Sequence, residues 1–61
     1  QLAFLQQAAE QGQAIAQSFL ADCYFYGKAI AKDEVQAVAW FRKAAEQGFA
    51  PAQEALRQLS K

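Results

Sequence analysis

The 61-residue sequence contains no histidine and a single cysteine, so the residue types that most often bind metals or act as nucleophiles are nearly absent. Cys23 has no partner for an intrachain disulfide, and the carboxylates are not grouped at metal-ligand spacing. A catalytic site needs a nucleophile, a base or a metal in mutual reach. We therefore predict no enzyme, no metal site and no cofactor, and we expect Cys23 to be a small buried hydrophobic residue. A hydrolase using Cys23 or Asp22 is the least favoured class.

The chain also has no excess of positive or negative charge, because six basic residues balance six acidic ones. A protein that follows a nucleic-acid backbone needs a basic stripe, and none is present. No apolar run approaches the ~20 residues of a membrane-spanning helix. The sequence thus predicts neither a nucleic-acid partner nor a membrane span.

The chain is short for an independent fold. A domain of about 60 residues buries only about 60% of its unfolded surface. Small folds usually add disulfides, a metal or association. With the first two disfavoured, the sequence favours association or membership of a longer protein, and Gln1 in place of Met agrees with the latter.

What the sequence does contain is an internal repeat. Residues 8–12 read Ala-Ala-Glu-Gln-Gly, and the same five residues return at 44–48. A shift of 36 residues pairs 25 positions, of which 10 are identical. A fixed period between about 20 and 50 residues indicates stacked structural repeats.

Apolar residues recur at spacings of three and four throughout, which predicts helices and no strand. Glycine after a helix stops it, and Asp33 is placed to cap the third helix, with Gln36 completing a capping box. We expect Ile30 to lie beneath the helices as a plug in the preceding loop. The expected helices cover residues 1–11, 13–26, 33–47 and 51–59.

The unit from residue 14 to 48 resembles a Sel1-like repeat, a relative of the tetratricopeptide repeat. The residues that carry the resemblance are Ala16, Leu20, Tyr24, Gly27, Asp33, Ala37, Trp40, Phe41, Lys43, Ala44, Ala45 and Gly48. It implies an all-α, right-handed helix-turn-helix solenoid of four antiparallel helices. Residues 1–12 would be the second helix of one repeat, 13–48 a full repeat, and 49–61 the first helix of another.

The sequence departs from the family pattern at three points. Ala21 stands where the family usually has glycine, and Ala29 replaces a loop glycine. Alanine resists the positive φ that glycine adopts, so the loop conformation is in question. The paired cysteines that staple some members are also absent.

The resemblance implies a non-catalytic adaptor or scaffold that binds a protein or peptide on the concave face lined by first helices. Phe25 lies opposite the expected core residues Ala16, Leu20, Cys23 and Tyr24 on a helical wheel, whereas Phe19 lies beside them. The candidate partner-binding residues are Ile15, Ser18, Asp22, Phe25 and Tyr26. Aromatic residues amid polar ones are typical of binding hot spots. The alternative, which is favoured for Phe25, is that it packs on a neighbouring first helix within the stack.

A second function is structural assembly through the ends of the solenoid. Stacks usually need about three repeats, and this chain has fewer than two. Apolar residues at both ends would then be uncovered, namely Leu2, Phe4, Leu5, Leu56 and Leu59. On this hypothesis the chain forms homo-oligomers.

Overall fold

The computed structural model describes residues 2–59 and contains, within that range, four α-helices and no strand. The helices are α1 (Leu2–Glu10), α2 (Ala14–Tyr26), α3 (Glu34–Glu46) and α4 (Ala50–Leu59). The all-α prediction is confirmed, and each helix starts or ends within a residue or two of its expected limit. Residue 1 of the first expected helix lies outside the described residues, and so do residues 60 and 61 of the expected third repeat.

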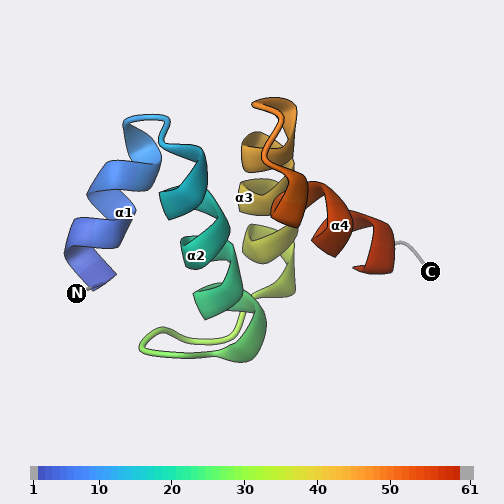
Figure 1. Ribbon diagram of the computed structural model, residues 1–61. Helices are drawn as coiled ribbons and strands as arrows, with labels where there is room; N and C mark the ends of the chain where they lie inside the picture. The colour runs from blue at the N-terminus through green and yellow to red at the C-terminus, as the bar shows by residue number, and fades with distance from the viewer. Residues whose placement is uncertain (1, 60–61) are drawn as a thin grey trace.

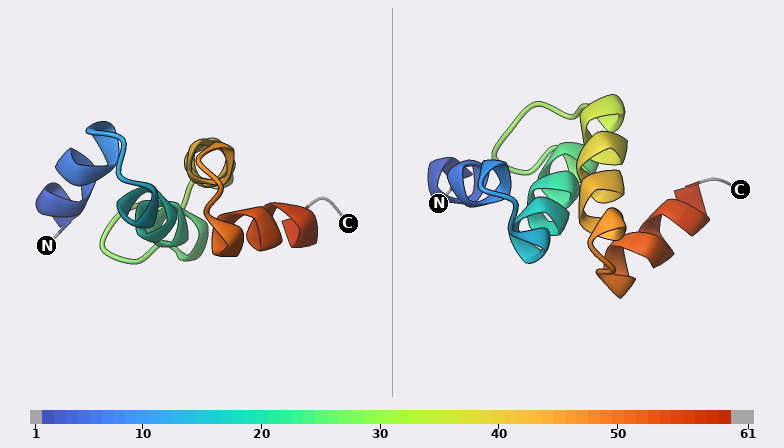
Figure 2. Two further views of the ribbon diagram at one scale, coloured as in Figure 1. Left: turned by 45° about the horizontal axis from the view of Figure 1, so that its top comes forward. Right: turned by 90° about the horizontal axis from the view of Figure 1, so that it is seen from above.

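The helices form a row in the order of the sequence, with α1 and α4 at its ends and consecutive helices running in roughly opposite directions (Figure 1). α2 packs against α1 and most extensively against α3, and α4 packs against α3. In the left view of Figure 2, α3 lies above α2 and α4, so these three helices alternate between two layers. The handedness of a longer solenoid stays a prediction.

The repeated Ala-Ala-Glu-Gln-Gly segment forms the same turn twice. In each copy glycine has a positive φ, 92° at Gly12 and 84° at Gly48. Backbone bonds of the Schellman type close both turns. They join Gln13 to Ala8 and Gly12 to Ala9 in the first copy, and Phe49 to Ala44 and Gly48 to Ala45 in the second. Identical sequence therefore produces identical helix-to-helix connections after α1 and after α3.

A glutamine side chain reinforces each of these turns. Gln17 Nε2 donates to the Ala9 carbonyl at 3.0 Å, and Gln53 Nε2 donates to the Ala45 carbonyl at 3.0 Å. Gln17 also accepts, through Oε1, a 3.0 Å bond from Gln47 Nε2. Its side chain is 4% exposed, so one buried amide connects the end of α1, helix α2 and the end of α3.

Asp33 caps α3 as expected, and its carboxylate accepts a 3.2 Å bond from the Gln36 backbone N–H. The reciprocal half of a capping box is absent. The Asp33 backbone N–H instead donates to the Tyr24 carbonyl at 2.9 Å. This bond ties the start of α3 to the last turn of α2 and closes the long loop.

The loop between α2 and α3 places Ala29 in the left-handed region, at φ 63°. A left-handed conformation costs a non-glycine residue about 1–2 kcal/mol. The loop therefore keeps the shape that a glycine would favour, at some cost in stability. Ala29 therefore does not prevent the loop from adopting the left-handed conformation.

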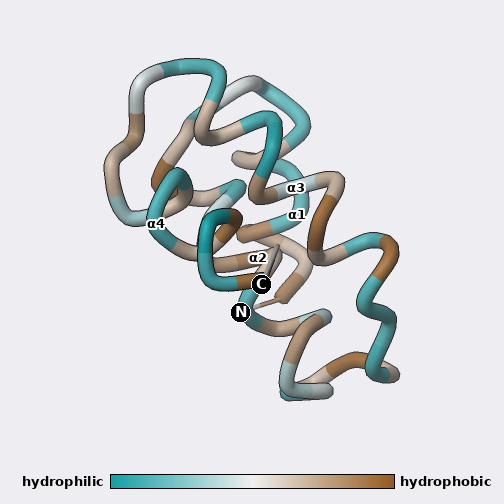
Figure 3. The backbone as a smooth tube through the Cα atoms, turned by 90° about the vertical axis from the view of Figure 1, so that its right-hand side faces the viewer, coloured by the Kyte–Doolittle hydropathy of each residue, from teal (hydrophilic) through white to brown (hydrophobic). Residues whose placement is uncertain are grey.

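The interior consists of two small clusters on either side of α2. One contains Ala21, Ala37, Phe41, Ala44 and Ala52, and the other contains Ala9, Ala16 and Leu20. Tyr24 and Trp40 pack against both clusters, as core aromatics. Hydrophobic and hydrophilic residues alternate at short intervals along the helices, as expected where each helix buries part of its surface (Figure 3).

Four side chains of the α2 region depart from the predicted pattern. Phe25 does not point away from the core, because it is half-buried and packs against the cluster that contains Phe41. Phe19, expected beside the core, is 57% exposed. Cys23 is half-buried and belongs to neither cluster, and the same holds for Ile30.

Candidate functional site

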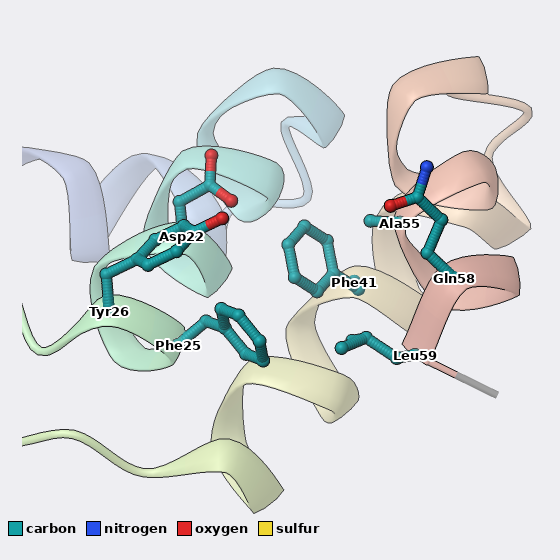
Figure 4. A pocket seen from close by; sticks show the side chains of 7 residues that line it. All are labelled: Asp22, Phe25, Tyr26, Phe41, Ala55, Gln58 and Leu59. Carbon is teal, nitrogen blue, oxygen red and sulfur yellow. The ribbon is translucent and has the colours of Figure 1, made fainter. Parts of the chain in front are cut away.

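A groove opens between α2 and α4, with α3 as its floor. Asp22, Phe25 and Tyr26 lie on one side, Ala55, Gln58 and Leu59 on the other, and Phe41 of α3 between them (Figure 4). We call these seven residues the α2–α4 groove. Its volume is about 230 Å³, below the roughly 300 Å³ at which small-molecule sites begin. The space fits a single large side chain better than a cofactor.

The aromatic wall of the groove is a packed pair. The Phe25 and Tyr26 rings meet edge to face, with centroids 4.9 Å apart and an interplanar angle of 89°. Phe25 is fixed from below by the core cluster, whereas Tyr26 is 64% exposed. Lys28 Nζ lies 5.8 Å from the centroid of the Tyr26 ring, within the range of a cation–π contact. Tyr26 is therefore the aromatic residue that a partner can reach.

Asp22 supplies the negative charge of the groove. Its carboxylate forms no salt bridge and accepts no hydrogen bond from the residues that the structure describes. Burial raises the pKa of Asp22 above its ordinary value of 3.8, and the nearby Lys28 ammonium offsets that rise only in part. A partly desolvated carboxylate, with no salt bridge to any described residue, therefore lines the groove.

The structure brings together three of the five residues expected from the sequence. Asp22, Phe25 and Tyr26 line the groove, whereas Ile15 and Ser18 do not. Ile15 is 58% exposed nearer the start of α2, and Ser18 is half-buried.

The sequence interpretation missed the other side of the groove. Ala55, Gln58 and Leu59 lie more than 28 residues further along the chain, and Phe41 was assigned to the core alone. The repeat itself was the signal that could have found them. A 36-residue shift places Gln58 at the position of Asp22, so a groove residue of α2 has its counterpart on α4.

Within residues 2–59 no group of three or more His, Cys, Asp and Glu side chains could hold a metal ion. No helix in the same range has the length and apolar character needed to cross a membrane.

Short antiparallel helices, a 36-residue period and twice-repeated turns define an α-helical repeat protein of the tetratricopeptide type. The Sel1 repeat model matches residues 2–13 and 14–49, and the chain belongs to the Sel1 repeat family. Sel1 repeats generally mediate protein–protein interaction and are non-catalytic. The comparisons with curated proteins and with solved structures gave no match.

Proposed function

We propose that this chain is a protein-interaction module that holds a peptide segment of a partner in the α2–α4 groove. The observation that supports this proposal is the groove itself, in which a buried apolar floor at Phe41 lies beside the exposed aromatic ring of Tyr26. Peptide anchors of this kind are large side chains inserted into apolar pockets with polar rims. Asp22 and Gln58 supply such a rim here.

Tyr26→Ala is expected to weaken peptide binding by about tenfold or more, as the loss of an aromatic hot spot does. Binders would be selected from a random peptide library displayed on phage, and the affinity of a selected peptide would be measured by fluorescence polarisation. Tyr26 is a better probe than Phe25, because Phe25 packs against the core and its removal would also weaken the fold.

The matched control is Phe19→Ala, which removes another exposed aromatic ring of α2 outside the groove. Its affinity should stay within about twofold of the unmodified chain, since distant surface changes have small effects. If Phe19→Ala weakens binding as much as Tyr26→Ala, or if Tyr26→Ala binds normally, the groove is not the binding surface.

The exposed face of α1 supports a second candidate function, assembly of copies of the chain. Phe4 corresponds by the 36-residue shift to Trp40, yet Phe4 is 73% exposed whereas Trp40 packs against both clusters. Phe4 also lines a hollow with Gln7, Ala8, Gln11 and Gln13. The surface that α3 buries against α2 is thus uncovered on α1.

On this second proposal, the molar mass measured by light scattering should rise above that of a monomer as concentration increases. Phe4→Gln should return it to the monomer value, because the substitution removes an exposed ring without disturbing a core residue. Val35→Gln changes a similarly exposed apolar residue on α3. It serves as the control and should leave association unchanged. A concentration-independent monomer mass for the unmodified chain would exclude assembly.

A further inference from the structure

The α2–α4 groove combines two features that together select a particular kind of peptide. Its floor, at Phe41, is apolar, and so are parts of both walls, at Phe25 on one side and at Ala55 and Leu59 on the other. Among the seven residues that line it, Asp22 carries the only charge at neutral pH, and that charge is negative. A ligand that complements both features carries a large apolar side chain and a cation close together.

The geometry of the Tyr26 side supports a cationic ligand independently of Asp22. The Tyr26 ring already accepts an ammonium group at 5.8 Å, from Lys28 of the same chain. Lys28 is exposed and makes no salt bridge with Asp22 within the described residues, so a ligand cation competes only with its contact to the Tyr26 ring and its longer-range attraction to Asp22. Asp22 and Tyr26 are one helical turn apart and line the same side of the groove (Figure 4).

We infer that the groove recognises a partner segment in which a lysine or arginine is adjacent to a large apolar residue. This inference rests on the proposed peptide-binding function and specifies its ligand. The apolar side chain fills the space over Phe41, and the cation meets the Asp22 carboxylate and the Tyr26 ring face.

The partial burial of Asp22 disfavours its ionised form in the folded chain. Because the pKa of Asp22 is raised in the folded chain, the folded state holds this proton more tightly than the unfolded state does. The stability from this difference is present below pH 3.8 and is lost as pH rises through the raised pKa. At neutral pH the ionised carboxylate therefore opposes folding, and a cationic ligand offsets that cost.

The test uses three capped peptides, Gly-Ser-Phe-Lys-Ser-Gly and its versions with Gln or Glu in place of Lys, titrated into the isotopically labelled chain. The Lys peptide should shift the amide NMR signals of Asp22, Tyr26 and Leu59 and bind about fivefold or more tightly than the Gln peptide at low salt. The Glu peptide should bind most weakly. Asp22→Asn should reduce these differences, because the Tyr26 ring alone then attracts the cation, while leaving the melting temperature at neutral pH undiminished.

Each other outcome has a distinct meaning. If all three peptides shift the groove signals with equal affinity, the charge selection is wrong and the proposed binding function stands. If Asp22→Asn keeps the full preference for the Lys peptide, the cation is bound elsewhere and the inference is likewise overturned. If no peptide shifts any groove signal while selected library peptides do bind the chain, the apolar-plus-cationic ligand is wrong. If neither kind of peptide affects the groove, both proposals fall.

Discussion

Replacing Phe41 by alanine is expected to lower the free energy of unfolding by about 3–5 kcal/mol, the usual cost of emptying a large buried aromatic site. Phe41 is the one aromatic side chain that is buried in the cluster shared by α2, α3 and α4. A chain of this size has a total stability of only about 3–9 kcal/mol. The variant should therefore lose a large part of its stability, seen as a sharp fall in the midpoint of urea unfolding followed by circular dichroism at 25 °C.

Two further variants separate packing from general loss of hydrophobic surface. Phe41→Leu retains most of the volume and should cost less than about 1.5 kcal/mol. Phe19→Ala removes the same number of atoms from an exposed site and should change stability by about 0.5 kcal/mol or less. A Phe41→Ala variant that loses less than about 1 kcal/mol would contradict the assignment of Phe41 as the centre of the interface between helices.

The contrast between Phe19 and Phe25 explains why the helices could be predicted and the orientation of α2 could not. Helix limits follow from local features, namely apolar spacing, Gly12, Gly48 and the Asp33 cap, and the structure agrees with them. Apolar residues occur almost all round α2, since it is covered by α1 on one side and by α3 on the other. A helical wheel assumes one buried face, so it placed Phe25 outside and Phe19 near the core.

The candidate groove shows the same division between local and tertiary information. Asp22 and Tyr26 were identified because they lie on the first helix of the repeat, and the structure places both in the groove. Leu59 and Gln58 became neighbours of these residues only because α4 packs against α3. That packing depends on the repeated turn. Only a comparison of the two repeat copies in the sequence would have predicted it.

The repeat also permits a comparison within one molecule. Gln17→Ala is expected to lower the free energy of unfolding by about 2–3 kcal/mol, because it empties a buried site and removes two hydrogen bonds. Gln53 occupies the equivalent position on α4, is exposed and makes the corresponding bond to Ala45. Gln53→Ala should therefore cost about 0.5–1 kcal/mol. Thermal and urea unfolding of the two variants measure both values.

The difference between these two costs has a specific structural source. Gln17 also bonds to Gln47, which lies in the turn at the other end of the same repeat, whereas no such second bond is described for Gln53. A double-mutant cycle of Gln17→Ala and Gln47→Ala isolates that link, and a coupling of about 0.5–1 kcal/mol is expected for a partly buried amide pair. Zero coupling, with Gln17→Ala and Gln53→Ala costing the same, would mean that the glutamine stabilises its own turn alone and contributes nothing to the packing of α2 against the end of α3.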